Sequence, residues 1–175
     1  MKKLVCAVLL TAMIAAAAGC GNQTPAVTTK PADTTAATQE SKPANTDVKA
    51  SDITKAVLEA TPINSAFEKK LESIPDYFDG LDTDKIKDSS YFICASGAYP
   101  DEIAAFRFDS SDSAKAAVSA VNDRLQYQKD TYKDYTPEEY YKLEDAVVEQ
   151  QGEWVIYLVT GDNTKAKETA LGFIS

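Results

Sequence analysis

The chain has 175 residues, contains no histidine and carries a formal net charge of −9 at pH 7. From Ser51 onward it holds 24 Asp or Glu against 13 Lys or Arg, so the part that we expect to fold carries a net charge of −11. Such an acidic surface repels nucleic acid and anionic lipid, and we expect neither as a direct partner. The absence of histidine removes Ser–His and Cys–His pairs, histidine-containing zinc sites and the commonest general base near neutral pH.

The first segment has the pattern of a secretory signal. Lys2 and Lys3 precede an uncharged apolar run from Leu4 to Ala18, and small residues lead directly to Cys20. A helix over that run would be about 22 Å long, shorter than the roughly 30 Å hydrocarbon core, so a cleaved signal is favoured over a permanent membrane span. The end of the run resembles the bacterial lipoprotein signal, which implies that residues 1–19 are removed and that Cys20 receives lipid. An ordinary secreted product and an uncleaved anchor are the alternatives.

Residues 20–50 are rich in Thr, Ala and Pro and contain almost no large apolar side chain. Such a segment cannot bury enough surface to offset the conformational entropy that ordering would cost. We interpret it as the lipidated Cys20 followed by a disordered tether, and residues 51–175 as a single folded domain. Two acyl chains on Cys20 would hold this domain at the extracytoplasmic face of a cell membrane without spanning it.

Two helices are predicted at the start of the domain. Ser51 is a suitable N-cap for a helix that ends before Pro62 and that carries its apolar residues on one face. Apolar residues recur at helical spacing over residues 63–74 and predict a second helix, which Pro75 would end.

Four acidic residues follow in one polar stretch, namely Asp79, Asp82, Asp84 and Asp88. An EF-hand calcium loop needs oxygen ligands at alternate positions, then a glycine and a distal glutamate, whereas Gly80 precedes most of these acids. We therefore interpret them as turn and helix-capping residues, with a loose cation site as the alternative. No metal site and no cofactor is predicted.

The pattern changes to two strand-strand-helix units near Ser90. Four apolar runs have strand character: residues 91–95, 103–108, 146–149 and 154–159. A capped helical stretch follows each pair of strands, the first ending near Tyr135 and the second reaching the C-terminus. We therefore predict an α+β fold with a mainly antiparallel sheet of about four strands. The two later helices would pack on one face, and the N-terminal helices would cover an edge or the other face.

Cys94 is the only cysteine left to the domain if Cys6 leaves with the signal and Cys20 is lipidated. It lies within the apolar run 91–95, where a cysteine usually acts as a small buried hydrophobe. A reactive or intermolecular thiol is the alternative.

Five tyrosines are concentrated around the end of the predicted long helix: Tyr127, Tyr132, Tyr135, Tyr140 and Tyr141. Tyrosine rings are rigid and amphipathic, so together with the neighbouring carboxylates they can stack on sugars or hold a peptide. They can equally fill a corner between helices and keep their hydroxyls in water. We take these five residues as the candidate binding residues, and the sequence offers no catalytic set.

Three stretches of the chain carry a resemblance to a known family, namely Ser96–Phe106, Leu143–Val148 and Trp154–Val159. Together they resemble the pattern of a clostridial lipoprotein family known as domain of unknown function 4358 (DUF4358). The similarity covers about Ser51 to Ile174. It implies a Gram-positive, membrane-anchored protein, and it transfers no activity and no catalytic residue.

These observations favour a membrane-anchored extracytoplasmic lipoprotein whose domain is not an enzyme and binds a peptide, an envelope protein or a cell-wall glycan. One alternative is an envelope hydrolase that uses carboxylates or Cys94. The other is a spacer or assembly subunit without a ligand of its own.

Lipidation of Cys20 predicts that the mature chain partitions into the detergent phase of a membrane extraction. Replacing Cys20→Ala removes the thiol that the lipid would alkylate, so we expect the variant to stay uncleaved or to be released from the membrane. Electrophoretic mobility and phase partition measure both effects. A variant that matches the wild type in both would contradict the lipid anchor.

Overall fold

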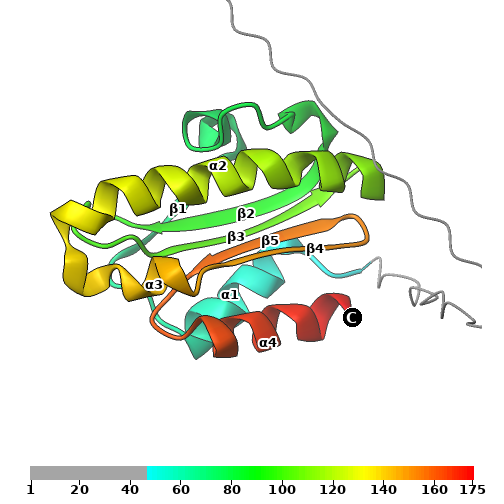
Figure 1. Cartoon of the computed structure of the whole chain (residues 1–175). Helices are drawn as coiled ribbons and strands as arrows, with labels where there is room; N and C mark the ends of the chain where they lie inside the picture. The colour runs from blue at the N-terminus through cyan, green and yellow to red at the C-terminus, as the bar shows by residue number, and fades with distance from the viewer. Residues whose placement is uncertain (1–46) are drawn as a thin grey trace, which may run out of the picture. The chain divides into compact units, whose positions relative to one another are not determined.

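A five-stranded antiparallel sheet with the strand order β1-β2-β3-β5-β4 organises residues 47–175, which are the residues that the computed structural model describes (Figure 1). Its strands are β1 (Ala66–Lys69), β2 (Ile86–Cys94), β3 (Glu102–Phe108), β4 (Val147–Gln151) and β5 (Trp154–Val159). The predicted signal, Cys20 and nearly all of the predicted tether lie outside the described residues.

Four α-helices and three short 3₁₀ helices accompany the sheet. The α-helices are α1 (Ala50–Ala60), α2 (Ser111–Tyr135), α3 (Tyr141–Glu144) and α4 (Asn163–Ile174). The 3₁₀ helices are η1 (Leu71–Asp76), η2 (Thr83–Lys85) and η3 (Pro137–Glu139). None of the helices in residues 47–175 combines the length and the apolar character that crossing a membrane requires.

Strands β3 and β5 form the centre of the sheet because their side chains are apolar on both faces. Every residue of β5 is buried, and in β3 only Arg107 is partly exposed. Residues such as Phe106 and Tyr157 pack under α2, whereas Ile103 and Ile156 pack under α1 and α4 on the opposite face. The sequence of a strand that is buried on both faces is a continuous apolar run, whereas a strand with one exposed face alternates apolar and polar residues.

The predicted α+β class and the antiparallel sheet are confirmed, with β1 as a fifth strand. The prediction that the two later helices share one face is wrong, because α2 covers one face while α4 lies beside α1 on the other (Figure 1). A single layer of helices would leave half of the apolar side chains of β3 and β5 in water. The burial of both faces therefore requires helices on both sides.

The helix predicted for residues 63–74 is also wrong, since this segment forms β1 and η1. Ser65 has a φ of 50°, a left-handed conformation that interrupts a helix. β1 then pairs with β2 in the register Phe67 to Ile93, and Phe67 remains 55% exposed. Of the apolar residues that suggested one helix face, Ile74 joins the core under α2. Pairing with a neighbouring strand has overridden the local helical spacing.

Helix α2 follows its sequence closely. The Ser110 side chain accepts a hydrogen bond from the backbone N–H of Ser113 and so caps the helix. Ala114, Ala117 and Val121 form the buried stripe of the helix against the sheet. Small side chains at these positions let the helix lie close to the sheet.

A buried ion pair fixes α2 in register against β3. The Nε and Nη2 groups of Arg124 donate to the two carboxylate oxygens of Glu102, and the two side chains are only 14% and 3% exposed. Burial raises the pKa of Glu102, although the neighbouring guanidinium opposes the shift. The pair therefore specifies one position of the helix on the sheet.

Gln128 provides a second polar connection one turn further along α2. The Tyr157 hydroxyl of β5 donates to its side-chain oxygen, and its Nε2 donates to the carbonyl of Pro100 at 3.0 Å. Burial raises the pKa of Tyr157 well above its usual value, so this hydroxyl remains a donor. The C-terminal half of α2 is thus tied both to β5 and to the β2–β3 loop.

The buried pair predicts a specific pattern of stability in a double-mutant cycle. Arg124→Met leaves the Glu102 carboxylate buried without its partner, and we expect a loss of about 3–5 kcal/mol in the free energy of unfolding. Replacing both residues with methionine removes the unpaired charge and should recover most of that loss. Urea denaturation of the single and double variants measures the effect. A double variant that is less stable than Arg124→Met would contradict this account of the pair.

Candidate functional site

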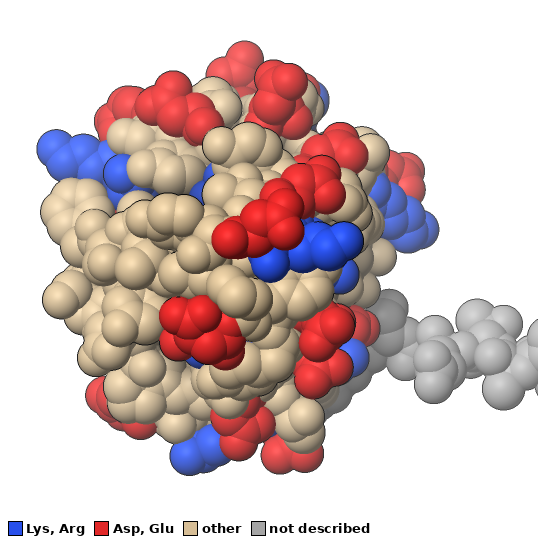
Figure 2. All heavy atoms as spheres, turned by 60° about the vertical axis from the view of Figure 1, so that its left-hand side comes forward, with Lys and Arg blue, Asp and Glu red and all other residues tan. Residues whose placement is uncertain are grey.

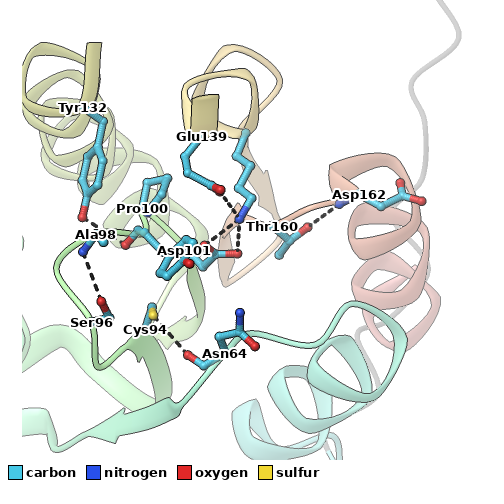
Figure 3. A network of polar contacts seen from close by, with 12 residues as sticks. Asn64, Cys94, Ser96, Ala98, Pro100, Asp101, Tyr132, Glu139, Thr160 and Asp162 are labelled. Carbon is cyan, nitrogen blue, oxygen red and sulfur yellow. Dashed lines mark hydrogen bonds and ion pairs between the residues drawn. The ribbon is translucent and has the colours of Figure 1, made fainter. Parts of the chain in front are cut away.

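Four connections converge at the end of the sheet where β2 and β5 end and β3 begins. They are the α1–β1, β2–β3, α2–α3 and β5–α4 connections. Between them lies a groove of about 370 Å³, and Figure 3 shows its surroundings. The groove is lined by Pro62, Asn64, Tyr99, Asp101, Glu139, Tyr141, Lys142 and Gly161.

The charged cluster of the groove centres on the buried Lys142 of α3. Its Nζ lies 2.9 Å from Oδ2 of Asp101 and 2.6 Å from Oε2 of Glu139. The two carboxylates converge from the start of β3 and from η3 (Figure 3). This cluster ties three separate parts of the chain together at one end of the sheet.

The protonation of the cluster follows from burial and pairing. Burial raises the pKa of Asp101 above its usual value, and Lys142 only partly opposes this shift. Burial alone would lower the pKa of Lys142, but its bonds to Glu139 and Asp101 outweigh the burial and raise it. Lys142 is therefore held as an ammonium ion.

Tyr99 and Tyr141 form the exposed rim of the groove. Their side chains are 36% and 49% exposed, and the Lys142 ammonium lies 5.6 Å from the centroid of the Tyr99 ring. Tyr141 and Gly161 also border an adjoining hollow of about 220 Å³. The groove and the hollow thus lie side by side and share Tyr141 and Gly161.

The β2–β3 wall of the groove is braced by Tyr132 of α2. Its hydroxyl lies 3.0 Å from the carbonyl oxygens of both Gly97 and Tyr99, which share its single hydrogen as acceptors. Within the loop, the N–H of Ala98 donates to Oγ of Ser96, as Figure 3 shows. The loop that carries Tyr99 is therefore held in one conformation by a helix.

The opposite wall is fixed by Asn163 at the start of α4. Its side-chain oxygen accepts the backbone N–H of Thr160 at 2.8 Å, and its Nδ2 donates to the carbonyl of Lys142 at 2.8 Å. The backbone N–H of Asp162 donates to Oγ1 of Thr160 (Figure 3). Both walls are therefore preorganised, which lowers the entropy cost of binding.

Cys94 lies below the groove and is buried, as predicted. Its side chain is part of the apolar cluster under α1 and α4, and its thiol donates to the carbonyl of Asn64 at 3.0 Å (Figure 3). The thiol thereby joins the end of β2 to the α1–β1 connection.

Three of the predicted tyrosines lie at this end of the sheet. Tyr141 lines the groove, and Tyr132 and Tyr135 pack edge to face beside the β2–β3 loop with ring centroids 6.3 Å apart. Tyr127 lies elsewhere and lines a separate cleft, and Tyr140 packs against the core under α2. The five residues therefore do not form a single face.

Sequence reasoning missed the groove residues Tyr99, Asp101, Glu139 and Lys142 as a set. The Lys142–Asp101 contact joins positions 41 residues apart, and no local pattern encodes it. The available signal was Lys142 itself, which directly precedes a leucine that the fold must bury and is therefore drawn toward the interior.

The surface around the groove is mostly uncharged. Figure 2 shows the molecule from the side of these loops, with a large uncharged area that separate acidic side chains interrupt and border. Protein-binding surfaces commonly combine aromatic residues and few charges at the centre with a polar rim.

Two of the four acids that were expected to serve turns and helix caps, Asp82 and Asp88, make such contacts. The Asp82 side chain accepts the backbone N–H of Asp84, and Asp88 accepts the N–H of Ala50 at the start of α1. Within residues 47–175, His, Cys, Asp and Glu side chains form no group of three or more that could hold a metal ion.

Fold and groove together define a small α+β domain with a tyrosine-rimmed groove at one end of a five-stranded sheet. The family model described as Domain of unknown function (DUF4358) matches residues 56–160, and the chain belongs to this family. The match spans all five strands and most of the groove, and it confirms the resemblance found in the sequence. No curated protein and no solved structure matches the chain.

The Lys142 cluster predicts a pH-dependent contribution to stability. Because the folded-state pKa of Lys142 is raised above 10.5, the stabilisation from its pairing is fully present below that pH and is lost as pH rises through the folded pKa. Lys142→Met should cost about 3 kcal/mol near neutral pH, since it leaves Asp101 buried without its partner. The difference from wild type should shrink at alkaline pH.

Urea denaturation between neutral and alkaline pH measures this difference, with the exposed Lys165→Met as the matched control. The control should stay close to wild type at every pH. A difference for Lys142→Met that grows with rising pH would contradict the assignment.

Proposed function

We propose that this protein is a membrane-anchored extracytoplasmic lipoprotein whose domain binds a polypeptide segment of an envelope protein without catalysing a reaction. The observation that carries the proposal is the groove itself, in which two exposed tyrosine rings stand above a floor of paired charges between braced loops. Lipid on Cys20 would hold this surface near the membrane.

The aromatic rim supports a binding role. Tyr99 and Tyr141 are large side chains that remain exposed at the rim of the groove. Tyrosine provides a rigid contact area at low conformational entropy cost and is enriched among the residues that dominate binding energy. A ligand that covers both rings would bury apolar surface that is now in contact with water.

The size and the lining of the groove favour a polypeptide segment. The groove of about 370 Å³ shares Tyr141 and Gly161 with the neighbouring hollow of about 220 Å³, and together they suit a few residues of extended chain. The walls are loops, which expose backbone donors and acceptors. A cell-wall glycan in the same groove is the competing outcome of the test below.

The ionisation of the groove supports binding rather than catalysis. A nucleophilic lysine needs a lowered pKa, whereas the pKa of Lys142 is raised by its two carboxylates. Asp101 and Glu139 are both paired with Lys142, so neither carboxylate is free to act as a base. The hydrolase alternative would require this cluster to separate.

Site-specific photo-crosslinking in cells tests the proposal. We expect p-benzoylphenylalanine at position 141 to capture an envelope protein, because Tyr141 lies at the rim of the groove. The same crosslinker at position 127, which is also exposed but lies outside the groove, is the matched control and should not give that product.

Adding Tyr99→Ala should reduce the product from position 141 severalfold, since it removes the opposite side of the rim. Digestion of the product with a protease or with a wall-degrading glycosidase then distinguishes a protein from a glycan. Equal products from positions 141 and 127, or a product that Tyr99→Ala leaves unchanged, would contradict the proposed binding site.

A further inference from the structure

A second cleft lies between the segment after η1 and helix α2, apart from the groove of the proposed function. Its volume is about 500 Å³. It is lined by Asp76, Tyr77, Asp79, Asp123, Arg124 and Tyr127. The two sides of the cleft therefore come from segments that are about 45 residues apart in the chain. Of its lining, the sequence offered Tyr127 as a binding residue and Asp79 as a turn residue or loose cation ligand.

The guanidinium group of Arg124 gives the cleft a fixed donor group. Its bonds to Glu102 hold it in place, and its central carbon lies 5.3 Å from the ring centroid of Tyr77 and 5.5 Å from that of Tyr127. Tyr77 in turn packs edge to face against the buried Tyr91, with ring centroids 5.4 Å apart. Two of the five N–H groups of an arginine are used by Glu102, and among the described residues the others have no hydrogen-bond partner.

Tyr127 gives the cleft an open aromatic surface. Its side chain is 63% exposed and stands one helical turn after Asp123 on the same side of α2. A ligand can therefore stack on this ring without any rearrangement of the core.

The three carboxylates of the cleft are free acceptors. Within residues 47–175, the side chains of Asp76, Asp79 and Asp123 make no hydrogen bond and no ion pair. Each carboxylate offers two acceptor oxygens beside the exposed ring.

We infer that this cleft binds an uncharged saccharide, which goes beyond the polypeptide groove of the proposed function. A pyranose ring has an apolar face that stacks on Tyr127, hydroxyl groups that donate to the carboxylates, and oxygens that accept from Arg124. An anionic ligand would be repelled by the three carboxylates. A cationic side chain would pair with the carboxylates but would leave the N–H groups of Arg124 without an acceptor, whereas a saccharide supplies both hydrogen-bond donors and acceptors.

Saturation-transfer NMR with the full chain in detergent micelles tests this inference, with chitotetraose and cellotetraose as the uncharged probes. We expect transfer to the sugar ring protons of at least one probe. Tyr127→Ala should weaken the binding about tenfold, because the stacking surface is lost. Tyr127→Phe keeps the ring and should bind like wild type.

Two further variants separate the two sites. Asp123→Asn keeps the shape of the cleft but weakens an acceptor, and we expect severalfold weaker binding. Tyr141→Ala alters only the groove and should leave saccharide binding unchanged, so failure of one proposal is distinguishable from failure of the other.

Three outcomes would overturn the inference. One is the absence of transfer to both probes at millimolar concentration, and another is transfer that Tyr127→Ala leaves unchanged. The third is binding of oligolysine at the cleft without binding of either saccharide, which would identify a site for cations instead.

Discussion

Two adjacent carboxylates at the start of β3 hold the elements on which both candidate sites depend. Glu102, the first residue of β3, meets Arg124 of α2, and Asp101, directly before the strand, meets Lys142 of α3. Each carboxylate is buried, so separating it from its partner would leave an unpaired charge away from water. The positions of α2 and α3 relative to the sheet are thereby specified, and with them the β2–β3 loop that Tyr132 braces.

Both candidate sites combine charged groups that are held in place with tyrosine rings that remain exposed. In the groove, the charges of the floor are paired with one another and the tyrosines remain at the rim. In the second cleft, Arg124 is held in place by its ion pair with Glu102, and the three carboxylates that line the cleft remain unpaired. A domain held at a membrane through Cys20, as we propose, would thus offer an aromatic polypeptide groove and a polar saccharide cleft on one sheet.

The sequence predicted those features that are encoded locally. Strong apolar runs predicted β3 and β5, and the helical stretch that was expected to end near Tyr135 is α2. The helix expected at residues 63–74 failed because the pairing of Phe67 with Ile93 is not visible in the local spacing. Tyr132 and Tyr141 were found from composition alone, whereas Asp101 and Lys142 were not, since their contact exists only once β3 and α3 are packed together.

Amide hydrogen exchange of the anchored protein tests the central claim, that the groove at the end of the sheet is the binding surface, most directly. Exchange in native membranes is compared with exchange of the purified chain in detergent. We expect slower exchange in the membranes for the β2–β3 loop, η3 and the β5–α4 connection, and unchanged exchange for β4 at the far edge of the sheet. Equal exchange of the groove segments in both samples, or protection confined to β4, would contradict the claim.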